Sequence, residues 1–459
     1  MAQFRKDTHQ YLADNKTLYE VVMLADQYGN MVGPANPSGM AVDAFGRARS
    51  SLPFTLFDSA HRYRENDKFN TANTAGGTYA FASNTSSIDC TVTTTSGAYV
   101  YRESKRVFAY QPGKSLQILK TFVMESPKAN LRQRVGYFGT DNGFFLEQSG
   151  ASTVQFVKRS KVTGSVVDTT VTQANWNMDP LDGTGPSHLT LDLTSPQILF
   201  IDVEWLGVGS VRMGFVINGQ FIHCHTFHHA NLSASAKGAY TQTASLPLRA
   251  EIENTGTTAS SSTLKVICAT VISEGGYSLS GRSSTIGQDP TGQFQMASAG
   301  TYYPVVAIRL NPSNPDQVVV PTDISLMPIN QAFYRYKIIV GATLTGAVWT
   351  NATSTSCVQY NTNASATMSG GTDMYSSYVT STVQGGGTAN FNDGEIFKYQ
   401  LERDTFANTT TTFVLAVTCG TATSNVCGSI TWEEVTKGKS WKNSFKDLKS
   451  YWLILSHLV

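Results

Sequence analysis

The chain has 459 residues, and its 41% hydrophobic and 11% aromatic content can form two or three folded cores, which excludes a disordered polypeptide. Only 15% of the residues are charged, against a usual share of about 25%, and the formal net charge is +1, which excludes nucleic-acid binding by bulk electrostatics. Ser, Thr, Gly and Asn take the place of the charged residues, as is typical of strands joined by turns.

Residues 1–55 are predicted to form an N-terminal arm or anchor. Residues 1–25 allow a short helix or an extended segment, and residues 26–55 are rich in Gly, Pro, Asn and Ser. The first residues lack the apolar stretch of a secretion signal, and no run of about 18 apolar residues predicts a membrane span. The six cysteines are therefore expected to be reduced and mostly buried, although Cys419 and Cys427 could bridge a hairpin.

Residues 56–280 are predicted to form a β-sandwich of the jelly-roll type, because turn signals recur and helical periodicity is nearly absent. YQPGK at 110–114 predicts a type II turn that joins two strands. Asn-Gly at 142–143 and at 218–219 predicts two hairpins. Residues 248–272 predict a further pair of strands joined by a polar loop.

The remaining chain is predicted to comprise a linker at 281–300, a second β-rich domain at 301–436 and an amphipathic C-terminal helix at 437–459. Such a helix would fold back on its own domain, dock on a neighbouring subunit or lie on a membrane surface. Apolar residues at steps of three and four are the candidate contact residues, namely Trp441, Phe445, Leu448, Trp452, Leu455 and Val459.

FIHCHTFHHAN at 221–231 contains four of the eight histidines. If the preceding Asn-Gly forms a two-residue turn, alternation directs Cys224 into the core and places His223 and His225 together on the other face. The same register puts Arg212 opposite His225, and a cation is unfavourable beside a metal ligand. No metal is expected within one chain, but three copies of the pair could meet an ion on a trimer axis. The alternatives are structural or interface histidines and a pH-responsive interface.

Acidic residues provide further candidates. Two pairs recur at i and i+2, namely Asp202 with Glu204 and Glu251 with Glu253. Paired acids occur in glycosidases, but this spacing is more typical of the solvated face of a strand. The loop at 175–185 offers Asp179 and Asp182 as calcium ligands without the spaced acids of a strong site.

Enzyme motifs are not found. Gly113-Lys114-Ser115 lacks the preceding glycine and following helix of a phosphate-binding loop, and the motifs of serine hydrolases and zinc proteases are missing. The chain is therefore expected to be no enzyme and to need no cofactor.

Several segments resemble virion structural proteins of tailed phages of marine cyanobacteria. They are MAQFRKDTHQYLADNKTLYEVVMLADQYGN at the start, YRESKRVFAYQPGKSLQILKTFVM at 101–124, LRQRVGYFGTDNGFFLEQSG at 131–150, and the stretches 175–231 and 248–278. The short Asn-Gly turns also resemble a concanavalin-like jelly roll, whereas 437–459 lies outside the resemblance. The family supplies no catalytic residues.

The resemblance implies a structural component of the virion, in the tail, neck, baseplate or a fibre-like appendage, assembled in the host cytoplasm. Its expected partners are other virion proteins and its own copies, with a trimer favoured by the cyclic symmetry of such appendages. The alternative is a carbohydrate-binding adhesin that recognises glycans of the host surface. No nucleic acid and no membrane span are expected.

Overall fold

The computed structural model describes residues 51–232, 238–278, 281–382 and 399–435, together with short strands outside these ranges. Residues 1–52 and 53–459 form separate units, and the first contains β1 (Gln10–Ala13), β2 (Thr17–Glu20), β3 (Leu24–Ala25) and β4 (Met31–Val32). The rest of the predicted arm up to residue 50 lies outside the described residues. So does the predicted C-terminal helix with Trp441, Phe445, Leu448, Trp452, Leu455 and Val459.

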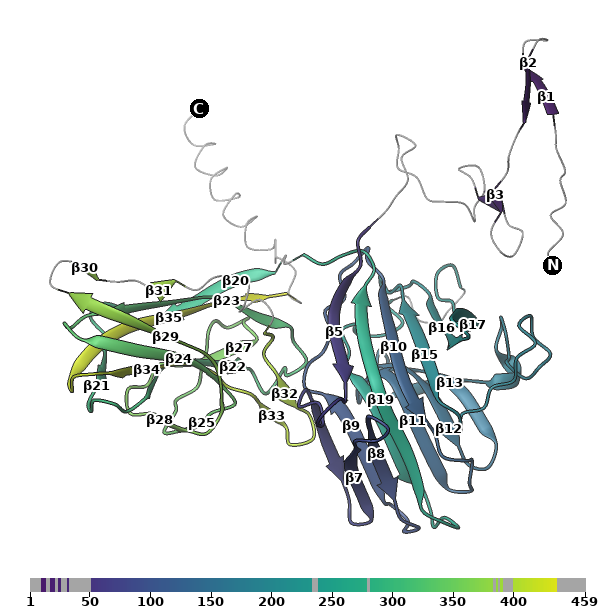
Figure 1. Cartoon of the computed structure of the whole chain (residues 1–459), viewed down its shortest axis with the longest axis horizontal. Coiled ribbons are helices and arrows are strands. Elements are labelled where there is room, and N and C mark those ends of the chain that lie inside the picture. Colours follow the sequence, from purple (N-terminus) through teal and green to yellow (C-terminus); the bar gives the residue numbers. More distant parts are fainter. Residues whose placement is uncertain are drawn as a thin grey trace, which may run out of the picture. The chain divides into compact units, whose positions relative to one another are not determined.

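The predicted all-β fold is confirmed, since strands dominate the described residues and the one helical element among them is the 3-10 turn η1 (Gln173–Asn175). The first sandwich has two antiparallel sheets (Figure 1). One contains, in order, β17 (Gln220–Phe227), β16 (Val211–Ile217), β15 (Gln197–Val203), β10 (Leu116–Val123), β19 (Ser262–Ser273), β8 (Ser87–Val92) and β7 (Gly77–Ala82). The other contains β14 (Val167–Thr172), β13 (Thr153–Ser160), β12 (Gly143–Ser149), β11 (Leu131–Phe138), β18 (Leu248–Asn254), β9 (Tyr99–Ser104) and β6 (Phe69–Asn73).

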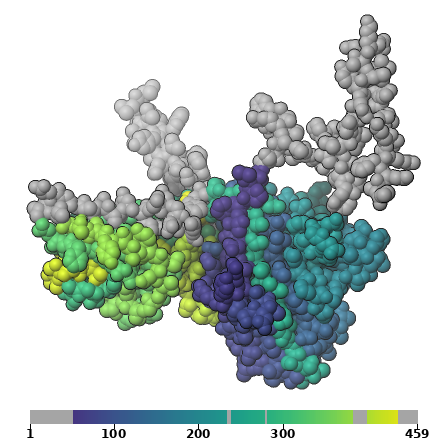
Figure 2. Space-filling model, in the orientation of Figure 1, coloured from purple at the N-terminus to yellow at the C-terminus, as the bar shows by residue number. Residues whose placement is uncertain are grey.

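An eighth strand of the first sheet, β5 (Phe54–Ala60), pairs with β19 and lies along it at the surface of the molecule (Figure 2). Its first two residues belong to the segment predicted as the arm, so the sandwich begins slightly earlier than the sequence indicated.

Two predicted strand pairs are not hairpins. The turn at 110–114 forms, with the Lys114 amide donating to the Gln111 carbonyl at 3.0 Å, but the strands before and after it, β9 and β10, belong to opposite sheets. The consecutive strands β18 and β19 are also divided between the sheets. In both places the chain crosses the core, which turn chemistry alone does not encode.

The core of the first sandwich follows the alternation of its strands. On β10, Leu116, Ile118 and Phe122 are almost fully buried, while the alternate residues Gln117, Leu119 and Thr121 are half-buried. The inward position between Ile118 and Phe122 holds Lys120, whose Nζ donates to the Arg249 carbonyl of the opposite sheet at 2.7 Å. Burial, with a smaller contribution from the charge of Arg102, lowers the pKa of Lys120 to about 7.

A second sandwich follows. One of its sheets contains β20 (Arg282–Gly287), β35 (Ser424–Glu434), β23 (Val319–Pro328) and β31 (Ala389–Asn390), with β21 (Phe294–Met296) on β35. The other contains β26 (Thr350–Asn351), β27 (Val358–Asn361), β22 (Tyr303–Leu310), β34 (Phe413–Cys419), β24 (Phe333–Val340), β29 (Thr372–Thr382) and β30 (Gly385–Gly386). Two small ribbons pair β25 (Thr343–Thr345) with β28 (Thr367–Ser369) and β32 (Arg403–Asp404) with β33 (Thr409–Thr410). The segment 281–300, predicted as a linker, instead provides β20 and β21, because both pair with β35.

A buried arginine connects the two sandwiches. Arg403 on β32 is 2% exposed; its guanidinium contacts Glu103 on β9 at 2.7 Å and Asp316 at 2.8 Å. It also donates to the Ser104 carbonyl at 3.0 Å. All six cysteines are free thiols, and five of them are buried.

Candidate functional site

The hairpin of β16 and β17 carries the histidine-rich segment. Asn218 and Gly219 have φ angles of 54° and 77°, as the predicted two-residue turn requires, and Phe215 pairs with Ile222. Next to the turn the predicted register is therefore confirmed. Gly214 also lies opposite His223, as expected.

Beyond His223 the predicted register is wrong, because Cys224 is an extra residue in the strand. The pairing shifts between Met213 and Gly214, so that His225 lies opposite Met213 and not opposite Arg212. Paired residues share a face of a sheet, and Met213 is fully buried in the core. The bulge therefore places His223 and His225 on opposite faces, whereas the sequence predicted one shared face.

His225 has a structural role. Its Nδ1 accepts a hydrogen bond from the Asn177 amide at 3.3 Å, and burial is the main cause that lowers its pKa to about 4. The Asn177 side chain pairs with the backbone of Thr226 in both directions at 2.9 Å. The Cys224 carbonyl, released by the bulge, accepts from the amides of Met178 and Asp179. The segment at 177–179 thus covers the open edge of β17.

His223 lies on the outer face, where its Nε2 contacts the Thr226 hydroxyl at 2.8 Å. Burial lowers its pKa, and Arg212 adds to the effect. Within the part of the chain that the structure describes, no three His, Cys, Asp or Glu side chains gather as metal ligands. A trimer-axis ion held by His223 and His225 would need both side chains on one face, which the bulge prevents.

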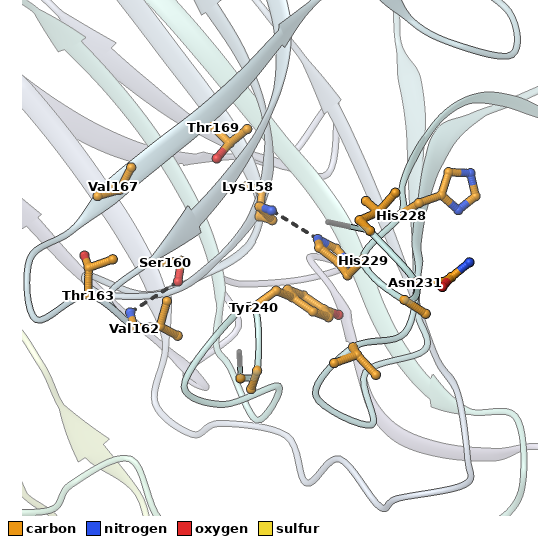
Figure 3. A pocket seen from close by; sticks show the side chains of 15 residues that line it. Lys158, Ser160, Val162, Thr163, Val167, Thr169, His228, His229, Asn231 and Tyr240 are labelled. Carbon is orange, nitrogen blue, oxygen red and sulfur yellow. Dashed lines mark hydrogen bonds between the residues drawn. The ribbon is translucent and has the colours of Figure 1, made fainter. Parts of the chain in front are cut away.

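The other two histidines line a pocket of about 580 Å³ at one end of the first sandwich (Figure 3). Its walls are the end of β13, the start of β14, Val208 from the β15–β16 connection, and the segments that follow β17. Its polar lining includes Lys158, His228, His229 and Tyr240. The volume falls in the range of small-molecule sites.

His229 is held in one tautomer. Its Nδ1 lies 2.7 Å from the Gly209 carbonyl, which can only accept, so Nδ1 carries the hydrogen. Nε2 is then an acceptor, and the Lys158 ammonium donates to it at 3.1 Å. The imidazole stacks on the Tyr240 ring with centroids 3.6 Å apart. Burial lowers the pKa of His229 to about 4, so the ring is neutral near pH 7.

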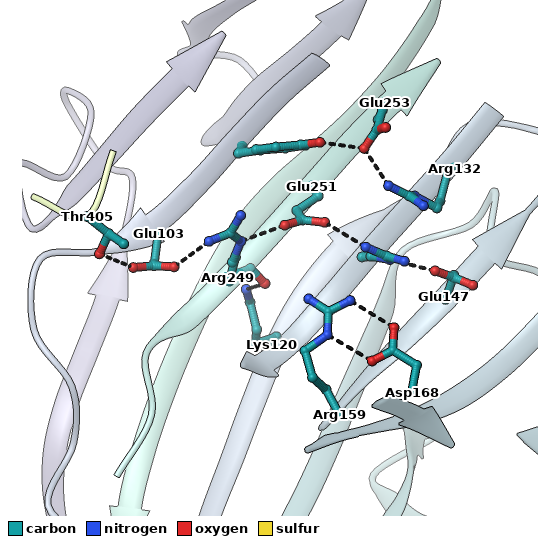
Figure 4. Close-up of polar contacts among 12 residues, drawn as sticks. Glu103, Lys120, Arg132, Glu147, Arg159, Asp168, Arg249, Glu251, Glu253 and Thr405 are labelled. Atoms are coloured by element: carbon teal, nitrogen blue, oxygen red, sulfur yellow. Dashed lines mark hydrogen bonds and ion pairs between the residues drawn. The ribbon is translucent and has the colours of Figure 1, made fainter. Parts of the chain in front are cut away.

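Of the four predicted acids, Glu251 lies in a chain of ion pairs on the seven-stranded sheet, on the face that points away from the core (Figure 4). The chain runs from Thr405 to Glu103, Arg249, Glu251, Arg134 and Glu147, with contacts of 2.5–3.3 Å. Each carboxylate is neutralised by at least one arginine of a neighbouring strand, so Glu251 has a structural partner on both sides.

The other predicted acids are also separated. Glu253 contacts Arg132 at 2.6 Å and accepts a hydrogen bond from the Tyr101 hydroxyl. Burial alone would raise the pKa of Glu253, but these two partners together outweigh burial and lower the pKa below its usual value. Asp202 lies 3.5 Å from Arg212, and burial raises its pKa to about 6. Glu204 is exposed. No two of the four predicted acids form a hydrogen-bonded pair in the described residues.

The predicted calcium loop is closed by its own backbone. Asp179 accepts hydrogen bonds from the amides of Leu181 and Ser187 at 2.9 and 2.8 Å. Asp182 accepts from the amide and hydroxyl of Thr184. The two carboxylates thus stabilise separate turns.

Sequence reasoning missed Lys158 and Tyr240. The first had a detectable signal, since alternation along VQFVKRS places Lys158 on the same side as the core residue Phe156. Tyr240 lies outside the strands and had none.

No family model matches the chain, and no curated protein matches it. Among solved structures, it is similar to the carbohydrate recognition domain of Emp47p, with 8% identity, a TM-score of 0.30, and coverage of 51% of this chain and 99% of that one. It is also similar to the CBM2 module of the evolved Dit of Lactobacillus casei BL23 phage J-1, with 7% identity, a TM-score of 0.32, and coverage of 50% and 100%. A third similar structure is a Bacteroides ovatus glycoside hydrolase of family 16, with 8% identity, a TM-score of 0.32, and coverage of 47% of this chain and 99% of that one.

These identities and TM-scores are too low to indicate a ligand or an activity, and the two-sheet architecture follows from the order of the strands. The described residues include no helix that is long and apolar enough to cross a membrane.

Proposed function

We propose that this protein is a non-catalytic component of a tailed-phage particle that binds a carbohydrate of the host surface through the pocket of its first sandwich. The observation that carries the binding proposal is the pocket itself, which combines an aromatic and imidazole stack, polar donors and an apolar rim. Sugars offer both hydroxyl groups and C–H faces, and such mixed surfaces recognise them.

The rim supports this function because it exposes apolar side chains that have no core to fill. Val162, Val167, Val208 and Leu232 line the pocket and are 40–59% exposed. Val162 and Val167 belong to the β13–β14 hairpin, Val208 to the β15–β16 connection and Leu232 to the segment after β17, so three separate parts of the chain contribute to the rim.

The proposal that the protein is not a catalyst is based on the contacts of the described carboxylates. Glu251, Glu253 and Asp202 each face an arginine, and none of the described residues that line the pocket is acidic. A glycosidase needs two opposed carboxyl groups at the scissile bond.

The place in a phage particle is proposed from the sequence resemblance, with assembly in the host cytoplasm, contacts to other virion proteins and a homo-oligomer, a trimer being favoured. The buried ion pairs around Arg403 suit such a role, because they tie the second sandwich to the first. Mass spectrometry of purified particles tests this placement; a particle that lacks the chain would contradict it. Deletion of 1–55 or 437–459 should abolish incorporation if these segments anchor the protein.

Carbohydrate binding is tested with the full chain on a glycan array that includes envelope polysaccharides of marine cyanobacteria. Val208→Asp should remove specific binding, because it places a charge on the rim at a side chain that is 46% exposed and so tolerates the change. Val348→Asp in the second sandwich, 63% exposed, is the matched control. Binding that survives in the Val208 variant, or is never detected, would exclude the pocket as the site.

A further inference from the structure

Lys158 is a cation in the pocket that has no acidic partner among the described residues. It projects from β13 toward the space between the sheets and is half-buried, with its Nζ 5.8 Å from the Tyr240 ring centroid and 6.0 Å from that of Phe227. Its hydrogen-bond partner among the described residues is His229. No Asp or Glu of the described ranges lies within ion-pair distance of it.

The basic residues on the other face of the same sheet behave differently. Arg132, Arg134, Arg159 and Arg249 each contact a carboxylate at 2.5–2.8 Å. These four arginines are therefore neutralised on the sheet, whereas Lys158, the lysine among the described residues that line the pocket, keeps its charge available. Burial lowers the pKa of Lys158, and no neighbouring carboxylate opposes the effect.

The neighbours of Lys158 orient its ammonium group. His229 accepts one of the three hydrogens through Nε2, and its Nδ1 is already engaged by the Gly209 carbonyl. The neutral His229 ring accepts a hydrogen bond from Lys158 but carries no negative charge that could balance the ammonium. His228 does not share this position, since its Nδ1 contacts Ser210 and its ring points away from Lys158 (Figure 3).

We propose that the pocket selects an anionic saccharide, whose carboxylate or sulfate group pairs with the Lys158 ammonium while the sugar ring contacts the apolar rim. This inference rests on the proposed carbohydrate binding and names its ligand class. The anion supplies the partner that the described residues do not, and the half-buried position of Lys158 favours a charge-assisted hydrogen bond.

The size of the preference follows from this bond. Hydrogen bonds to charged groups contribute more than neutral ones, so an anionic oligosaccharide should bind at least about tenfold more tightly than its neutral counterpart. The preference should fall as salt rises, since the pocket is open to solvent.

Isothermal titration calorimetry on the full chain tests the inference with three probes: oligogalacturonate for carboxylate, sulfated dextran oligomers for sulfate, and unmodified dextran oligomers as the neutral reference. Tight binding of either anionic probe supports it, and the difference between the two identifies the anion. Lys158→Met should reduce anionic binding at least about tenfold. Lys158→Arg should retain much of it.

Lys161→Met is the matched control, because Lys161 lies just beyond β13 and pairs with Asp141 at 2.8 Å outside the pocket lining. If Lys158→Met fails to fold, the binding of the anionic probes to Lys158→Gln and the salt dependence of their binding to the parent test whether Lys158 pairs with the anion. Equal binding of neutral and anionic probes, or anionic binding unaffected in the Lys158 variants, would overturn the inference while leaving carbohydrate binding intact. No binding of any saccharide, here and on the array, would overturn both.

Discussion

Replacing Lys120 by Met should stabilise the protein at neutral pH. The pKa of Lys120 falls from 10.5 to about 7 because its ammonium is fully buried. At about 1.4 kcal/mol per pKa unit, keeping this charge in the core costs up to about 5 kcal/mol. Met has a similar length and no charge, but it forfeits the hydrogen bond to the Arg249 carbonyl, which contributes about 1–3 kcal/mol. We therefore expect the variant to be more stable by about 3 kcal/mol at pH 7.

The pH dependence identifies the cause of this gain. Between pH 7 and 10.5 the unfolded chain binds the Lys120 proton more tightly than the folded one, so the stability of the parent rises with pH relative to Lys120→Met. The difference in unfolding free energy between the variant and the parent should be constant below pH 7 and shrink toward pH 10. Urea unfolding followed by tryptophan fluorescence at pH 6, 7, 8.5 and 10 measures it. Lys265→Met, at a partly exposed ion pair with Asp89, serves as the control. A variant less stable than the parent at pH 7, or a difference that does not change with pH, would refute the reasoning.

Three further outcomes are expected. Arg403→Met should lower stability by about 3 kcal/mol, because buried Glu103 loses one of its two arginine partners and the Ser104 carbonyl loses its donor. Arg64→Met at an exposed pair should change stability by less than about 0.5 kcal/mol, and equal effects of the two changes in thermal unfolding would contradict this. Asp202→Asn should stabilise the protein by about 1–2 kcal/mol above pH 6, because burial raises the pKa of Asp202 in the folded state. The gain in stability should vanish as the pH falls toward 3.8, and a gain that persists in acid would count against burial as the cause. Asn218→Ala should lower stability by about 1 kcal/mol through its positive φ, and an unchanged melting temperature would argue against the turn.

The sequence predicts those features of the fold that depend on a few neighbouring residues. Asn218-Gly219 and Pro112-Gly113 fix the backbone angles of their turns, and both turns form. The sequence does not predict which sheet the next strand joins, because the crossing after Gly113 depends on the packing of the whole core. The linker at 281–300 was misjudged for the same reason, since β20 is a strand only where β35 lies beside it.

The candidate site shows a similar limit. The pairing arithmetic that put His223 and His225 on one face assumes that each residue has a partner. The bulge at Cys224 breaks this assumption, and it is stabilised by the amides of Met178 and Asp179, which lie more than forty positions away in the chain. The charge of Lys158 is visible in the sequence, but that no described carboxylate lies near it emerges only when the loops are brought together.

The bulge also bears on how the gene can change. Pairs on either side of Cys224 keep their order when that residue is skipped, because Gly214 lies opposite His223 and Met213 opposite His225. Strand β17 therefore holds one residue more than its partner strand at this point, and the pairs beyond it stay in register. A deletion at this codon would keep the remaining pairs in register, and its cost would lie in the lost core side chain of Cys224 and in the lost carbonyl contacts to the covering segment.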